Sequence, residues 1–237
     1  NRRRPCPTPW PQGERPPPVF CPRGSLLTHA RAAAQHGVGP HYTCGFSLCR
    51  FIAMTYCVAI KLHAGLVFLS DSRTNAGLDQ ISSFRKMMVY EKPDDRFMVL
   101  LSAGNLSISQ SVREILQTTQ IKDRDDAEGI TIWNAKSMFD AARVLGAAVR
   151  HVHDRDGAAL KRSGVDFNVS LVFGGQIRGE GMRLFQVYSA GNFIEATSET
   201  PYFQVGESKY GKPVLDRVIT PDTPLDEAAK CALVSMD

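Results

Sequence analysis

An abrupt change of composition at Met54 most constrains how this chain of 237 residues can fold. Residues 1–53 hold nine of the 14 prolines, including the run Pro16-Pro17-Pro18, and no lysine. Because proline fixes φ and removes a backbone donor, we expect this leader to be extended or disordered and to add nothing to a core. The sequence therefore predicts one folded domain over residues 54–237.

The leader admits several explanations. A transit peptide is rich in arginine and poor in acids, as this segment is, but it needs an amphipathic helix that the prolines forbid. A secretory signal needs an uninterrupted apolar centre near the start, and none precedes Pro40. We favour Met54 as the true start, with the leader arising from translation of a GC-rich upstream frame. A propeptide that is removed autocatalytically is the remaining alternative.

The charge distribution argues against nucleic-acid binding. The net charge is +4, but the leader alone carries seven arginines against Glu14, so residues 54–237 carry about −2. A mildly acidic body offers no basic face to a phosphate backbone. No apolar run approaches the roughly 20 residues that cross a bilayer. We therefore expect a soluble, cytoplasmic protein that has no membrane or nucleic-acid partner.

The cysteines predict neither a disulfide framework nor a metal site. Four of the six lie in the leader, and only Cys57 and Cys231 lie in the body. Cys44 and Cys49 could form half a metal site, but no second Cys or His pair follows at ligand spacing. The sequence thus predicts no metal and no cofactor.

The apolar periodicity after Met54 predicts an α+β domain. A hairpin is expected over residues 56–70, followed by two strands, then two helices, then three strands, then two helices, an order typical of packed sheets flanked by helices. The expected strands are Tyr56–Leu62, Leu66–Ser70, Lys86–Tyr90, Phe97–Ser102, Phe167–Phe173, Met182–Ser189 and Phe203–Val205. The expected helices are Ser107–Thr119, one with apolar positions from Met138 to Val152, Lys212–Val218 and Leu225–Met236, with a charged loop at Lys122–Glu128. Gly174-Gly175 and Gly179–Gly181 are expected to separate strands.

Thr55 is the candidate nucleophile. Methionine followed by a small residue is the arrangement that aminopeptidases trim, and trimming would leave Thr55 with a free α-amine. That amine, with an unperturbed pKa of about 8, can accept the proton of the residue's own hydroxyl and act as general base.

Three further residues fit around such a nucleophile. The ammonium of Lys86 would lower the pKa of the α-amine and keep it neutral near pH 7. Asp71, at the end of a predicted strand, could form an ion pair with Lys86. Gly104, between a strand and a helix, offers a backbone N–H suited to an oxyanion.

Four sequence blocks in this order resemble the Anbu family of bacterial proteasome-related peptidases, which are kin of proteasome β-subunits and of the peptidase HslV. The resemblance covers the chain from Met54 to its end. The blocks are Met54-Thr55-Tyr56-Cys57, Ser70-Asp71-Ser72-Arg73-Thr74-Asn75-Ala76-Gly77, Phe84-Arg85-Lys86-Met87 and Val205-Gly206-Glu207-Ser208-Lys209-Tyr210-Gly211-Lys212-Pro213.

The resemblance implies a four-layer αββα sandwich of the N-terminal nucleophile hydrolase type. It implies Thr55 as nucleophile and base, Asp71 and Lys86 as the supporting pair, and Gly104 as the oxyanion donor. Proteasome subunits have a Gly-Ser-Gly turn with a helping serine, where this chain has Gly206-Glu207-Ser208, which implies Ser208 as its counterpart. It also implies self-assembly into an open or closed ring that acts on peptides or unfolded proteins.

Other functions stay open from the sequence. A small-molecule amidohydrolase could use the same fold, and a catalytically silent ring scaffold would result if the leader stays attached to Thr55. Cys57 is interpreted as a buried small hydrophobe rather than a nucleophile. His151 and His153 are interpreted as surface residues near a helix end rather than metal ligands.

Overall fold

The computed structural model describes residues 55–75, 81–118 and 129–236. The leader, Met54, the predicted loop Lys122–Glu128 and Asp237 lie outside these ranges. The predicted hairpin is confirmed, because β1 and β2 pair antiparallel and β10 pairs with the other edge of β1, which gives the order β10-β1-β2. The bounds of this first sheet are β1 Tyr56–Leu62, β2 Gly65–Ser70 and β10 Tyr202–Gly206.

The second sheet is antiparallel throughout, with the order β5-β6-β7-β8-β9. Its strands β6 and β7 are the longest, and they pair over nine residues each. The bounds are β5 Met87–Lys92, β6 Arg96–Gly104, β7 Val169–Ile177, β8 Arg183–Val187 and β9 Phe193–Glu195.

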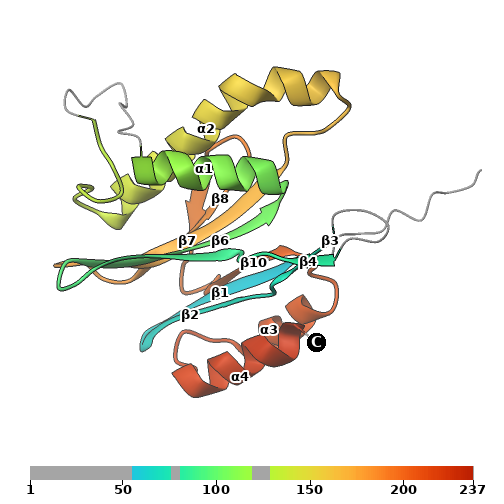
Figure 1. Cartoon of the computed structure of the whole chain (residues 1–237). Helices are drawn as coiled ribbons and strands as arrows, with labels where there is room; N and C mark the ends of the chain where they lie inside the picture. The colour runs from blue at the N-terminus through green and yellow to red at the C-terminus, as the bar shows by residue number, and fades with distance from the viewer. Residues whose placement is uncertain (1–54, 76–80, 119–128, 237) are drawn as a thin grey trace, which may run out of the picture. The chain divides into compact units, whose positions relative to one another are not determined.

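Four helices of the described residues lie in two pairs on opposite sides of the two sheets (Figure 1). The first pair packs on the five-stranded sheet, and the second pair packs on the three-stranded sheet. The bounds are α1 Leu106–Thr118, α2 Met138–Arg162, α3 Gly211–Val218 and α4 Leu225–Met236. The predicted α+β class with two sheets and four helices is thereby confirmed.

Strand β1 belongs to two cores at once, which explains why it is a continuous apolar run. Tyr56, Val58, Ile60 and Leu62 pack toward α3 and α4, whereas Cys57 and Ala59 pack against β6, β7 and β8 of the second sheet. Successive side chains of a strand point to opposite faces, so both sets must be apolar for both faces to be buried. The first strand is thus held between a helix layer and a sheet.

Three short strands were not predicted. These are β9 and the two strands of a small antiparallel ribbon, β3 Arg73–Asn75 and β4 Ile81–Ser83. Each has three residues, too few to establish an alternation of apolar and polar positions in the sequence.

Two predicted boundaries were wrong. Strand β7 does not end at Gly174-Gly175 but continues to Ile177, because a Cβ on Gly175 would lie 2.1 Å from the carbonyl oxygen of Phe97 on β6. Here glycine permits close strand pairing rather than a turn. Helix α2 continues ten residues past Val152 to Arg162. It ends there because Gly164, with φ of 70°, takes up the left-handed conformation that commonly terminates helices.

Among the residues that the structure describes, no helix is long and apolar enough to cross a membrane.

The two-sheet core yields a stability prediction. Phe173 on β7 is fully buried, whereas Phe97 on the adjacent strand β6 is 49% exposed. We expect Phe173→Ala to lower the free energy of unfolding by about 3–5 kcal/mol, because it leaves a cavity, and the matched Phe97→Ala to cost less than about 1 kcal/mol. Urea unfolding measures both, and equal losses would contradict this assignment of the core.

Candidate functional site

Thr55 lies immediately before β1 and is held through its backbone. Its carbonyl oxygen accepts a hydrogen bond of 2.8 Å from the backbone N–H of Glu207. Gly206, opposite Tyr56 in the β1-β10 register, has φ of 95°, and a Cβ there would lie 1.8 Å from the Thr55 oxygen. Only glycine therefore allows β10 to approach the first described residue this closely.

Asp71 and Lys86 form an ion pair beside Thr55. The Lys86 Nζ lies 2.7 Å from each carboxylate oxygen of Asp71, and the two side chains are 6% and 17% exposed. The pairing of β1 with β2 places Asp71 next to Tyr56, whose N–H donates to Asp71 Oδ1 at 2.9 Å, while Asp71 N–H donates to the Tyr56 carbonyl at 3.0 Å. A single carboxylate thus binds both the ammonium and the peptide that follows Thr55.

Thr55, Lys86 and Gly104 line one small pocket. Gly104 ends β6 with φ of 101°, and α1 begins two residues later, after Asn105 accepts a hydrogen bond of 3.0 Å from the Ser107 N–H at the helix N-terminus. The sequence prediction did not include the other lining residues, which are Phe84, Ser102, Ala103, Leu106 and Ser109.

Ser102 connects two of the strands that build this pocket. Its N–H and its hydroxyl both donate to the Lys86 carbonyl, at 3.0 and 3.3 Å, which fixes the backbone of Lys86 against β6. Ser102 is 4% exposed and stands in an apolar strand. A buried serine in the run Val99-Leu100-Leu101-Ser102-Ala103 is a signal in the sequence that could have identified it.

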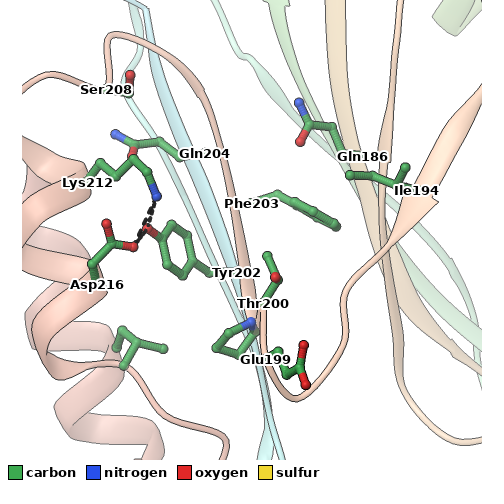
Figure 2. A pocket seen from close by; sticks show the side chains of 12 residues that line it. Gln186, Ile194, Glu199, Thr200, Tyr202, Phe203, Gln204, Ser208, Lys212 and Asp216 are labelled. Atoms are coloured by element: carbon green, nitrogen blue, oxygen red, sulfur yellow. Dashed lines mark hydrogen bonds and ion pairs between the residues drawn. The ribbon is translucent and has the colours of Figure 1, made fainter.

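Ser208 lies outside the set of residues that line the Thr55 pocket. It is exposed, its carbonyl accepts the Lys212 N–H at 3.1 Å, and it lines a different cavity of about 560 Å³ beside β10 and α3 (Figure 2). The catalytic role assigned to Ser208 from the resemblance therefore stays a prediction. It is the backbone N–H of the neighbouring Glu207 that donates a hydrogen bond to Thr55.

The larger cavity contains a polar cluster of its own. The Tyr202 hydroxyl donates a short hydrogen bond to Asp216, and the Lys212 Nζ lies 3.0 Å from the Tyr202 oxygen and 3.1 Å from Asp216 (Figure 2). Burial and the bond to Asp216 raise the pKa of Tyr202, so its hydroxyl stays protonated. This cluster fastens β10 to α3.

Cys57 is not a competing nucleophile. It is fully buried, and burial, reinforced by the charge of Asp71, raises the pKa of its thiol to about 12. The thiolate is the reactive form, so this cysteine is inert near neutral pH.

The described residues contain no group of three or more His, Cys, Asp or Glu side chains that could hold a metal ion. His151 and His153 are exposed on α2, in agreement with their interpretation as surface residues, but the helix continues to Arg162, so they do not lie near its end.

The buried ion pair predicts a large loss of stability on truncation. We expect Asp71→Ala to lower the free energy of unfolding by about 3 kcal/mol or more, because it leaves the buried Lys86 ammonium without its carboxylate. Asp226→Ala removes the carboxylate of an exposed pair with Lys230, 3.1 Å apart on α4, and should leave the urea midpoint unchanged. Equal shifts of the two midpoints would show that the Asp71 pair is screened by solvent.

Comparison with known proteins identifies the family. No family model matches the chain, and no curated protein matches it. Among solved structures, Anbu (ancestral beta-subunit) from Yersinia bercovieri is 53% identical, with 76% of this chain and 73% of that chain covered and a TM-score of 0.67.

Two other solved structures agree. Anbu from Hyphomicrobium sp. strain MC1 and the Anbu complex from Pseudomonas aeruginosa, described as a helical assembly, are each 48% identical over 76% of this chain and 73% of theirs, with TM-scores of 0.67 and 0.69. Sequence identity at this level, over most of both chains, shows more than a shared fold. The chain belongs to the Anbu family of proteasome-related proteins.

Proposed function

We propose that this protein is a threonine-type peptide hydrolase in which Thr55, as the N-terminal residue, is the nucleophile. The observation that carries the proposal is that Thr55, Lys86 and Gly104 line one pocket while Asp71 holds the Lys86 ammonium at 2.7 Å. These are the parts that amide hydrolysis requires: a nucleophile with its own base, a fixed positive charge and a backbone donor.

The α-amine of Thr55 takes the proton of the Thr55 hydroxyl as its Oγ bonds to the substrate carbonyl carbon. The Lys86 ammonium favours the neutral amine before this step, since a second positive charge nearby is repelled. The developing oxyanion accepts a hydrogen bond from the backbone N–H of Gly104.

The C–N bond of the substrate then breaks, and the departing amine receives the proton from the Thr55 ammonium. An ester between the Thr55 Oγ and the substrate acyl group remains. Water, deprotonated by the same α-amine, attacks the carbonyl carbon of this ester. The bond from that carbon to the Thr55 Oγ breaks, the Oγ takes the proton back from the ammonium, and the acyl group leaves as a carboxylic acid.

This mechanism requires that residues 1–53 and Met54 are absent from the mature chain. Either translation starts at Met54 and an aminopeptidase removes that methionine, or a propeptide is removed. The packing of one helix pair on each sheet supports a four-layer αββα sandwich of the N-terminal nucleophile type. Cys57 and Cys231 are free thiols in separate core clusters, which favours a reducing compartment such as the cytoplasm.

We also propose that the chain works as a homo-oligomer that encloses peptide or unfolded-protein substrates. The related protein from Pseudomonas aeruginosa is described as a helical assembly, and an open ring that does not close on itself is the geometry that propagates as a helix. Sedimentation of the purified protein tests this proposal, and a monomer at micromolar concentration would contradict it.

Replacing Thr55 is the direct test. We expect Thr55→Ala to abolish hydrolysis of fluorogenic peptides, a loss of at least about a thousandfold in kcat/KM, because the nucleophilic oxygen is gone. Thr55→Ser keeps a hydroxyl and an α-amine and should retain measurable activity. Cys57→Ala, two residues away, should retain activity as the matched control, because its thiol is buried and protonated.

The intact mass of the native protein accompanies these assays. A chain that begins at Thr55 satisfies the mechanism, whereas a chain that keeps residues before Thr55 and still hydrolyses peptides would refute the role of the α-amine. A chain that begins at Thr55 and hydrolyses no peptide would direct the search to small-molecule amides.

A further inference from the structure

The Tyr56 side chain reaches a buried junction of three elements behind the proposed nucleophile. Its hydroxyl lies 2.5 Å from Ser235 Oγ in the last turn of α4, and both residues are buried, at 7% and 4% exposed. A Cβ on Gly211, the first residue of α3, would lie 2.7 Å from the Tyr56 oxygen and 2.3 Å from the Ser235 carbonyl oxygen. The start of β1, the start of α3 and the end of α4 therefore meet at this phenol.

The direction of the hydrogen bond follows from the proton count. The Ser235 hydroxyl has one proton and donates it to the Ala232 carbonyl at 2.7 Å, so it accepts from Tyr56. Burial raises the pKa of Tyr56, so the phenol keeps its proton over the whole physiological range. Tyr56 of β1 is therefore the donor of this hydrogen bond, and Ser235 of α4 is the acceptor.

The buried junction and Thr55 are connected through the backbone in two ways. The Thr55 carbonyl accepts a hydrogen bond from the Glu207 N–H. Four residues further along the chain, Gly211 packs on the ring of Tyr56, the residue next to Thr55. The Tyr56 backbone N–H is meanwhile bound by Asp71. Anything that moves the phenol shifts either the peptide bound to Asp71 or the loop bound to Thr55.

We propose that Tyr56 and Ser235 are positioning residues, which set the placement of Thr55 by fastening the start of β1 to the last turn of α4. This inference rests on the proposed function, in which Thr55 is the nucleophile. Helices α3 and α4 lie on the opposite side of the two sheets from α1 and α2, and they thereby help to position Thr55. Misplacement of a reacting group by about 1 Å costs on the order of a hundredfold in rate, so a hydrogen bond this close to the nucleophile affects turnover.

The test uses Tyr56→Phe and Ser235→Ala in the mature protein that begins at Thr55. Each should lower kcat about tenfold and leave KM within about twofold, because the substrate-binding surface is intact while the nucleophile is displaced. The double variant should be no slower than either single variant, since both remove the same bond.

Tyr202→Phe is the matched control. Tyr202 is also a buried tyrosine of the first sheet whose hydroxyl binds a helix of the same layer, but it contacts Asp216 of α3 in the other cavity. We expect it to leave kcat within about twofold of the parent protein. An equal loss in Tyr202→Phe would overturn the proposal, because any loosening of the helix layer would then suffice.

Hydrogen exchange separates this inference from the proposed function. The Tyr56 amide, bound to Asp71, should exchange about tenfold faster in Tyr56→Phe and Ser235→Ala, and at the parent rate in Tyr202→Phe. If the parent protein hydrolyses no peptide, the proposed function fails, but this exchange pattern still supports the positioning role. Unchanged exchange and unchanged kcat in both variants would overturn it.

Discussion

The carboxylate of Asp71 is the contact on which the arrangement around Thr55 depends. Its two oxygens bind the Lys86 ammonium, and one of them also accepts the Tyr56 N–H. Three chain segments are thereby joined at one partly buried carboxylate: the start of β1, the end of β2 and the residue before β5. A buried charge is tolerated only when it is paired and hydrogen-bonded, so none of these segments can move alone.

Around this group, the two sheets supply rigidity from opposite sides. Side chains of β1 pack in both hydrophobic cores. Strand β6 of the second sheet contributes Gly104 and Ser102 to the pocket that Thr55 lines. A site built from the ends of packed strands keeps its geometry better than one built from loops. The arrangement fits the proposed reaction, in which the nucleophile and its base belong to a single residue that the surrounding strands hold in place.

Much of this could be predicted from the sequence where the signal is local. The hairpin β1-β2 and helix α4 were expected at nearly their observed bounds, since a continuous apolar run and a helical periodicity are each complete within a few residues. The ion pair of Asp71 with Lys86 was also expected from their places at strand ends, and it is present. The three-residue strands are too short to show an alternation of apolar and polar positions. The passage of β7 through Gly174-Gly175 depends on its pairing with β6, far away in the chain, which a local pattern does not contain. The role of Ser208 rests on the resemblance and stays a prediction, and the residue lines the cavity beside β10 and α3.

The two-sided pairing of β1 also determines where trimming of the chain would stop. An aminopeptidase needs its substrate in an extended, unpaired form, but from Tyr56 onward the backbone is paired with β2 on one edge and β10 on the other, with both faces buried. Removal of Tyr56 would require the first sheet to open. The paired backbone from Tyr56 onward is therefore a physical barrier that any trimming of the chain would meet at Thr55.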